Sequence, residues 1–195
     1  MTRLDPSALS QLFLDARTHY DWEEAPLPED MPEQLYELMK FGPTSANCSP
    51  ARLIFCASAE ARAKLAACVM EANRPKVLQA PVTVIIGMDM AFIDRLSELF
   101  PHDDAASWFR GNEALIHSTA FRNSSLQGAY LLMAARALGL DTGPMSGFDK
   151  AAVDAAFWTG TTVETNFICS LGHGTGRKLF PRLPRLSFDD ACRIA

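Results

Sequence analysis

Hydrophobic positions along the chain follow a helical period in some stretches and form continuous runs in others. Helices are predicted where apolar residues recur every three or four positions, over residues 9–16, 32–41, 59–69, 90–100, 113–138 and 150–157. Buried strands are predicted where apolar and β-branched residues follow one another, over residues 53–56, 80–87 and 166–171. Because helices and strands alternate, the pattern indicates an α/β or α+β fold.

The stretch over residues 113–138 is the longest of these, with 26 residues and no proline. It is apolar over most of its circumference, and such a helix is buried inside a domain or against a partner subunit. Its histidine, His117, is therefore expected in a core or at an interface. By contrast, residues 20–32 hold three prolines and five acidic residues, which predicts an extended, exposed connection.

Helix ends are marked by residues with specific backbone roles. Asp5, Ser58 and Asp149 are placed to cap the helices that follow them. Gly42 and Gly139 are placed as the C-terminal stops of the helices before them.

Two loops rich in proline and short polar side chains follow predicted helices. Residues 42–52 carry hydroxyl and amide groups between Pro43 and Pro50, which stiffen the loop. Residues 140–148 form a second loop of this kind. A stiff loop dense in short donors and acceptors suits a polar planar or phosphorylated ligand, although an ordinary turn has the same composition.

Composition limits the classes of partner. A chain of 195 residues with 48% apolar and 21% charged residues is typical of one globular domain. The net charge of −5 argues against nucleic acid or an anionic membrane as the main partner. With neither a long apolar run nor a signal-peptide pattern, a cytoplasmic protein is expected.

The sequence offers no evident nucleophile or metal site. Its five cysteines are widely spaced, its four histidines lack ligand spacing, and Cys48 alone lies in a polar loop. Arg17, Lys178 and Arg182 could converge on one phosphate or remain solvated, and a ligand contact by His173 stays open. Polar loops without a catalytic group favour a cofactor that carries the chemistry.

Three segments together resemble one protein family. They are Gly42-Pro43-Thr44-Ser45-Ala46-Asn47-Cys48-Ser49-Pro50-Ala51-Arg52, Phe121-Arg122-Asn123-Ser124-Ser125, and residues 137–148 with Gly143-Pro144-Met145-Ser146-Gly147. The chain resembles, from about Leu9 to Cys192, the nitroreductase family of FMN-dependent NAD(P)H oxidoreductases. Within that family it is similar to the branch of malonic semialdehyde reductases and NADH dehydrogenase/NAD(P)H nitroreductases.

The resemblance implies an α+β fold with a central, mostly antiparallel sheet flanked by helices. It further implies a single domain over residues 1–195, with residues 90–112 as an excursion over the active site. The long helix would pack across the interface of an intertwined homodimer. Each of two FMN sites would then use both subunits.

The resemblance also assigns the cofactor contacts. Arg17 and Thr18 would hold the phosphate and the ring edge, Asn73 would bind the ring, and Lys178 and Arg182 would bind the phosphate. The partner chain would contribute Pro43, Thr44, Ser45 and Asn47. Pro144, Met145, Ser146 and Gly147 would lie against the isoalloxazine, with a backbone N–H near Ser146 directed at N5.

The sequence departs from the family pattern in three segments. Tyr20 stands where a second basic residue is common, and Phe180 occupies one of the usual basic positions. Ser49-Pro50-Ala51 replaces the more usual Gln-Pro-Trp, which predicts a smaller pocket edge and a different substrate.

The implied reaction passes a hydride from NADH or NADPH through FMN N5 to a small carbonyl such as malonic semialdehyde, giving 3-hydroxypropionate in pyrimidine degradation. No side chain is assigned a catalytic role, and no metal is expected. The alternatives are a reductase of nitroaromatics or quinones, and a flavin-binding protein without turnover.

Overall fold

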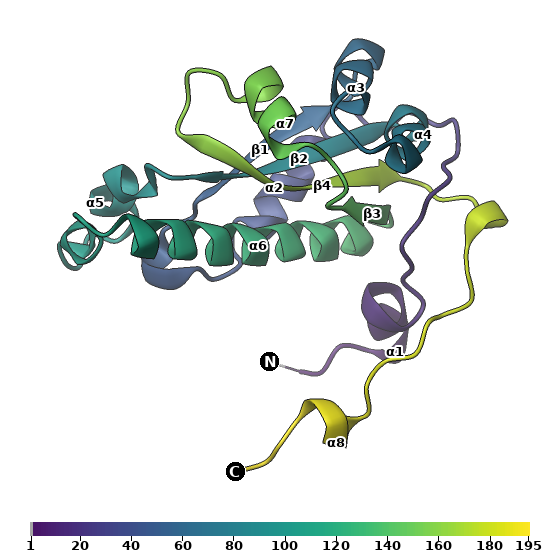
Figure 1. Cartoon of the computed structure of the whole chain (residues 1–195). Coiled ribbons are helices and arrows are strands. Elements are labelled where there is room, and N and C mark those ends of the chain that lie inside the picture. Colours follow the sequence, from purple (N-terminus) through teal and green to yellow (C-terminus); the bar gives the residue numbers. More distant parts are fainter. Residues whose placement is uncertain (1) are drawn as a thin grey trace.

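The computed structural model describes residues 2–195, and its centre is a four-stranded antiparallel sheet (Figure 1). The strands are β1 (Ala51–Cys56), β2 (Val82–Asp89), β3 (Asp141–Met145) and β4 (Val163–Gly172). They are ordered β1-β2-β4-β3, and every neighbouring pair is antiparallel. The edges of the sheet are therefore β1 and β3.

Successive side chains of β2 fill two different hydrophobic cores, because the side chains of a strand alternate between faces. Val84 and Ile86 pack with α2 (Met31–Met39) and α6 (Glu113–Ala137). Ile85 belongs to the core on the opposite face. Every position of β2 is buried, as its continuous apolar run predicts.

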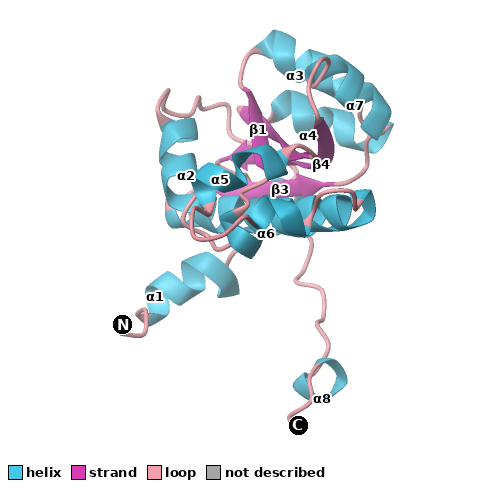
Figure 2. Cartoon of the chain, turned by 90° about the vertical axis from the view of Figure 1, so that its left-hand side faces the viewer, coloured by secondary structure: helices cyan, strands magenta, loops and turns pink. Residues whose placement is uncertain are grey.

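Three shorter helices cover that opposite face. They are α3 (Ala59–Ala66), α4 (Arg74–Gln79) and α7 (Lys150–Phe157). Leu65 and Val153 from this layer pack with Ile85. Figures 1 and 2 show the sheet between this layer and the layer of α2 and α6.

Residues 90–112 cover the N-terminal part of α6 with a third apolar cluster. The segment contains a 3₁₀ turn (Phe92–Arg95), α5 (Leu96–Leu99) and a second 3₁₀ turn (Ala105–Trp108). The rings of Phe92 and Phe109 meet edge to face at 5.2 Å. The helix predicted over residues 90–100 is thus in part wrong, because its first turn is 3₁₀ and only Leu96–Leu99 is α-helical.

Both ends of the chain leave the body on the same side (Figure 1). The first arm contains α1 (Pro6–Leu9) and a π-helical turn (Ser10–Leu14), and the second contains α8 (Phe188–Ala191). Apolar side chains on both arms are exposed, including Phe13, Leu14, Phe180, Leu183, Leu186 and Ile194.

The capping predictions are confirmed. The side chains of Asp5, Ser58 and Asp149 each accept a hydrogen bond from the N–H three residues later. The long helix is α6, and Asn112 caps it. The antiparallel sheet flanked by helices also confirms the α+β class.

The loop predicted over residues 140–148 is in part wrong, because its first half is β3. Glycine and proline there conceal the strand pattern. Pro144 is tolerated because β3 is an edge strand, where an outward N–H is not needed for a ladder.

Two further expectations are corrected. Asp21 and Trp22 are buried, although residues 20–32 were expected to be exposed. Gly42 does not adopt a positive φ. Glycine is needed there because the backbone lies against the Tyr130 ring, and a Cβ would be 1.9 Å from its Cδ2 atom.

Candidate functional site

Asn73 and residues 144–147 lie together at the β3 edge of the sheet. The Asn73 Nδ2 atom donates a hydrogen bond to the Gly147 carbonyl at 3.0 Å. A Cβ on Gly147 would lie 2.6 Å from this nitrogen, so the contact requires glycine. Ser146 follows the last β3 residue, Met145, and therefore lies beyond the β3–β4 register.

The segment with Arg17 and Thr18 runs beside the same strand. Thr18 and Thr142 of β3 form a parallel bridge, and the His19 N–H donates to the Thr142 carbonyl at 3.0 Å. The structure thus places Arg17 and Thr18 along the edge that carries residues 144–147.

Residues 14–23 and 173–182 form what we call the terminal clasp, in which the two segments run antiparallel. The Glu23 N–H donates to the His173 carbonyl at 2.8 Å, and the Thr175 N–H donates to the Asp21 carbonyl at 3.0 Å. Farther along, two arginines bond across the clasp to backbone carbonyls: Arg17 to Phe180, and Arg182 to Leu14 and Ala16.

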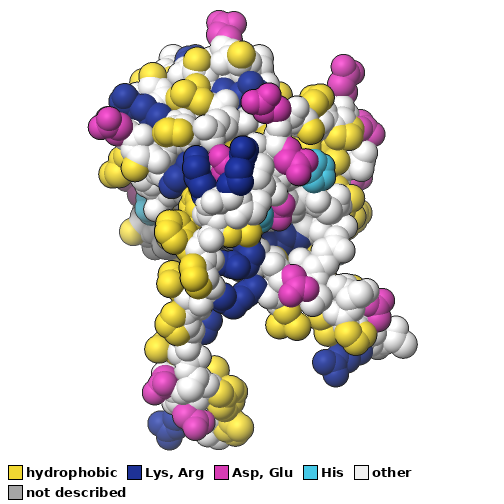
Figure 3. Space-filling view, turned by 90° about the vertical axis from the view of Figure 1, so that its right-hand side faces the viewer, with side chains coloured by type: hydrophobic (Ala, Val, Ile, Leu, Met, Phe, Trp, Pro, Cys, Tyr) yellow, Lys and Arg dark blue, Asp and Glu magenta, His cyan; other side chains and the backbone are white. Residues whose placement is uncertain are grey.

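The terminal clasp brings Arg17, Lys178 and Arg182 into one short stretch, although they come from opposite ends of the chain. Figure 3 shows Lys and Arg side chains gathered where the arms leave the body. Each arginine bonds through one terminal nitrogen, Nη2, and a guanidinium has five N–H donors in all. The remaining donors can bind an anion. We call these three cations, together with Thr18, Asn73 and residues 144–147, the β3-edge group.

A hollow of about 600 Å³ opens next to the clasp, lined in part by Tyr20, Lys76, Lys178 and Phe180. The Lys76 Nζ lies 4.7 Å from the centroid of the Tyr20 ring and donates to Asn73 Oδ1 at 2.8 Å. The rings of Tyr20 and Phe180 meet edge to face at 6.1 Å. Lys76 thus places a cation beside the position where Tyr20 replaces a basic residue.

Two buried amide side chains of α6 hold residues 43–50, the Pro43 loop: one bonds within the loop and the other bonds the first residue of β1, directly after it. Asn123 Oδ1 accepts from the Ser45 N–H at 2.8 Å, and Gln127 Oε1 accepts from the Ala51 N–H at 2.8 Å. Asn123 is 0% exposed and Gln127 is 4% exposed. Since amides so deeply buried cannot exchange these bonds for water, they hold the loop firmly.

Hydrogen bonds also hold the loop's own backbone in an unusual shape. Ala46, Asn47 and Ser49 have φ values of 49°, 49° and 38°, in the left-handed region. Thr44 Oγ1 accepts from the Ser49 N–H at 3.2 Å, and Asn47 Nδ2 donates to the Leu99 carbonyl at 2.8 Å. The Ser45 side chain remains exposed.

The Pro43 loop and the β3-edge group do not meet within the chain. The loop leads into β1, whereas Pro144 and Met145 lie in β3, at the opposite edge. Three strand spacings of about 4.8 Å separate these edges by about 14 Å. The predicted cofactor residues therefore fall into two sets.

Cys48 lies inside the Pro43 loop but is 1% exposed. Burial raises the pKa of its thiol to about 11. A thiol that is neutral and shielded is a poor nucleophile at neutral pH, although Cys48 lies in a polar loop.

The two histidines considered from the sequence are both exposed in the chain: His117 on α6, which was expected in a core or at an interface, and His173 in the clasp. Within residues 2–195, no three His, Cys, Asp or Glu side chains cluster in a way that could hold a metal ion. Over the same residues, the helices are too short or too polar to span a membrane.

Sequence reasoning missed four residues that organise the two sets. Asn123 and Gln127 lie one helical turn apart on the buried face of α6, and this spacing could have revealed them. Lys76 follows Asn73 by three residues, which places the two on one side of a turn. Asp21 had no local signal, because its partners lie at the other end of the chain.

The family model described as "Nitroreductase family" matches residues 14–173. A relative from Burkholderia lata is 61% identical over 194 residues, and the alignment covers 100% of both chains. A relative from Stenotrophomonas maltophilia is 56% identical over 192 residues, covering 98% of each chain. Both are named "Putative NADH dehydrogenase/NAD(P)H nitroreductase".

Solved structures share the fold at low sequence identity. A nitroreductase-named structure from Bacillus subtilis has a TM-score of 0.89 and 17% identity, covering 98% of this chain and 100% of that one. A structure from Exiguobacterium sibiricum, named as a nitroreductase in complex with FMN, has a TM-score of 0.86 and 20% identity, covering 100% and 99%. The nitroreductase-like fold is therefore confirmed.

Proposed function

Since the chain belongs to the nitroreductase family, we propose that it is an FMN-dependent NAD(P)H oxidoreductase whose β3-edge group binds the cofactor. The observation that carries this proposal is the meeting of three cations with the Asn73–Gly147 contact at one sheet edge. The FMN in the similar Exiguobacterium structure supports the choice of cofactor.

The donor set of the β3-edge group fits the chemistry of FMN. A phosphate dianion is best held by cations with several N–H donors, which Arg17 and Arg182 provide and Lys178 supplements. The ring edge carries carbonyl and N–H groups, which suit the Asn73 amide and the Lys76 ammonium. The Ser146 N–H, beyond the β3–β4 register, is our candidate donor to the flavin N5.

Bound FMN would supply the redox chemistry, taking a hydride from NAD(P)H and passing it to the acceptor. The residues of this chain would bind and orient the reactants. Cations near the ring edge favour the negative charge that develops on reduction.

We further propose that the second half of the site comes from another copy of this chain. The Pro43 loop lies at the wrong edge of the sheet to reach the β3-edge group of its own chain. On α6, Phe121 and Leu126 are exposed, with exposed fractions of 51% and 40%. Packing this face against a second copy would bury it and bring Thr44, Ser45 and Asn47 to the partner's cofactor.

For the acceptor, we propose a small carbonyl compound such as malonic semialdehyde, as in pyrimidine degradation. The small residues of Ser49-Pro50-Ala51 at the loop's end support a compact acceptor. The names of the two relatives favour nitro compounds as the second candidate.

The test is to titrate the purified full-length protein with FMN and then to add NADH or NADPH without oxygen. A flavin absorbance spectrum that NAD(P)H bleaches is expected, followed by reoxidation with an acceptor. Faster reoxidation by malonic semialdehyde than by nitroaromatics or quinones supports the carbonyl acceptor, and the reverse order selects the second candidate. Failure to take up FMN refutes the proposal, and bound FMN that stays oxidised would identify a binding protein without turnover.

A further inference from the structure

Asp21 is a buried carboxylate near the inner end of the terminal clasp, close to the body of the protein. Its residue is 7% exposed, yet no cofactor role has been assigned to it. Its Oδ2 accepts from Arg177 Nε at 2.9 Å and from the Thr175 hydroxyl, and its Oδ1 lies 3.2 Å from Lys178 Nζ. The Thr175 hydroxyl bond, with the Lys178 and Arg177 contacts, lowers the pKa of the carboxyl, so that it is ionised at neutral pH.

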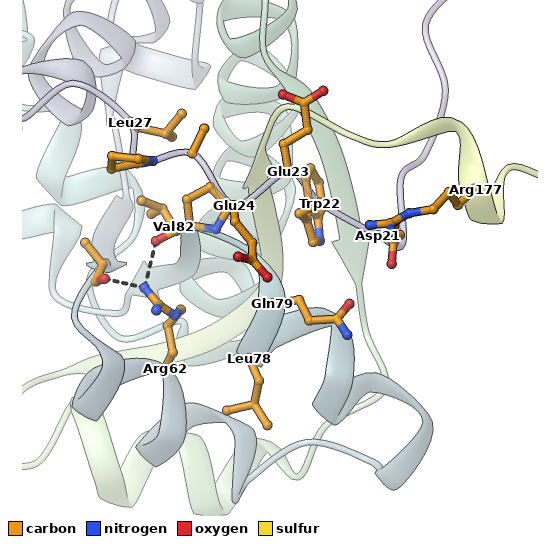
Figure 4. Close-up of a pocket in the computed structure, with 14 residues that line it drawn as sticks. Asp21, Trp22, Glu23, Glu24, Leu27, Arg62, Leu78, Gln79, Val82 and Arg177 are labelled. Atoms are coloured by element: carbon orange, nitrogen blue, oxygen red, sulfur yellow. Dashed lines mark hydrogen bonds and ion pairs between the residues drawn. The ribbon is translucent and has the colours of Figure 1, made fainter.

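The position of Asp21 determines what its contacts do. Next to it, Trp22 is buried, and a Cβ on Gly143 or Gly172 would touch its ring, so this side of the clasp is anchored to β3 and β4. Thr175, Arg177 and Lys178 lie on the other side, just before the segment becomes an exposed arm. Figure 4 shows Asp21 and Arg177 facing one another beside Trp22.

Beyond Asp21, the clasp is held mainly by exposed groups. Its outer bonds are those of Arg17 and Arg182 to backbone carbonyls, all of them exposed. Exposed contacts of this kind contribute little on their own. The N-terminal segment is still anchored to β3 at Thr18 and His19. On the C-terminal segment, the Asp21 carboxylate is therefore the last anchored contact before Arg182.

We propose that Asp21 is a positioning residue for the FMN phosphate site. By binding Thr175, Arg177 and Lys178 together, its carboxylate fixes the register of the clasp, and this register brings Lys178 and Arg182 beside Arg17. The assignment rests on the function proposed above.

The assignment predicts a change in FMN affinity on Asp21→Asn that is opposite to the change expected from charge alone. Asp21→Asn removes a negative charge close to a phosphate site, which by charge alone tightens FMN binding. If Asp21 positions the cations, the same substitution weakens binding because the cations lose their register. Asp21→Glu keeps the charge and its hydrogen bonds, so it should restore most of the affinity.

The experiment measures FMN dissociation constants of the full-length apoprotein by flavin fluorescence, for Asp21→Asn, Asp21→Glu, Arg177→Gln and the Asp21→Asn/Arg177→Gln double variant. We expect Asp21→Asn to bind FMN about tenfold more weakly, and the double variant to be no weaker than Asp21→Asn, because both act through one contact. Glu24→Gln is the matched control. It removes an exposed carboxylate three residues away, and its affinity should stay within twofold of wild type.

Limited trypsin digestion of the apoproteins gives a second readout that needs no flavin. Asp21→Asn should be cut after Lys178 and Arg182 several times faster than wild type, and Glu24→Gln at the wild-type rate. Equal or tighter FMN binding by Asp21→Asn overturns the assignment, as does an unchanged rate of cleavage. If the wild-type protein itself binds no FMN, the proposed function fails first and the assignment fails with it.

Discussion

The β3-edge group and the Pro43 loop are both assigned to one cofactor, yet different interactions hold them in place. The loop is fixed by Asn123 and Gln127, buried amides of the long helix α6. The cations of the β3-edge group lie on segments that end in exposed arms, and charged groups join them. The loop is thus fixed to the folded core, whereas the cation set has free donors that an anionic ligand can bind.

The largest expected effect falls on the cation set. Arg182→Ala removes a charge-assisted contact to phosphate and should weaken FMN binding by about 1.5–3 kcal/mol, with little change in the free energy of unfolding of the apoprotein. Fluorescence titration and urea unfolding measure the two quantities. Arg185→Ala, three residues farther out on the same arm, is the control. Unchanged FMN affinity of Arg182→Ala would reassign Arg182 to the solvated surface.

A substitution that releases the Pro43 loop should instead lower the stability of the fold. Asn123→Ala leaves the Ser45 N–H without its partner, so the free energy of unfolding should fall by about 1–3 kcal/mol. Urea denaturation measures the change, with Ser118→Ala, a half-buried residue of the same helix that does not contact the loop, as the control. A loss of FMN affinity without a loss of stability would contradict the structural role given to Asn123.

Alkaline pH should also weaken the region around the Pro43 loop. Burial raises the pKa of Cys48 to about 11, whereas a thiol of an unfolded chain ionises at about pH 8.5. The unfolded chain releases this proton first, so the free energy of unfolding falls as pH rises between these values, by up to about 1.4 kcal/mol per pH unit. Urea midpoints at pH 8 and pH 10 test this. Cys48→Ala should flatten the slope and Cys192→Ser, an exposed thiol, should leave it unchanged; equal slopes for both would refute it.

The smallest effect on stability is expected for an exposed ion pair that holds neither the Pro43 loop nor the cation set in place. Arg95 and Glu98 form an exposed ion pair at 2.7 Å on residues 90–112. Glu98→Gln should change the free energy of unfolding by less than about 1 kcal/mol, with FMN affinity unaffected. A larger change in the urea midpoint would mean that this segment carries more of the fold than its exposure implies.

Features of the fold could be predicted from the sequence where they depend on nearby residues, and could not where they depend on distant ones. Caps such as Asp5, Ser58 and Asp149 depend on neighbours three residues away, so their roles could be predicted. Strand β3 and the burial of Asp21 could not, because both depend on segments distant in the sequence. The resemblance assigned Arg17, Lys178 and Arg182 to one phosphate, but not the antiparallel clasp that brings them together. It also divided the site between two chains. That division stays a prediction, and the placement of the Pro43 loop at the far edge of the sheet is the argument for it.

A mixed dimer tests most directly whether the two regions are halves of one site in different chains. Chains with Arg182→Ala and chains with Ser45→Trp, in which an exposed loop side chain is replaced by one that blocks the cofactor, would be co-expressed with different tags and purified through both. If each site takes its loop from the partner, the mixed dimer has one site with both halves unaltered, and it should retain about one FMN per dimer, while either variant alone retains little. A mixed dimer as poor in FMN as its parents would contradict the account.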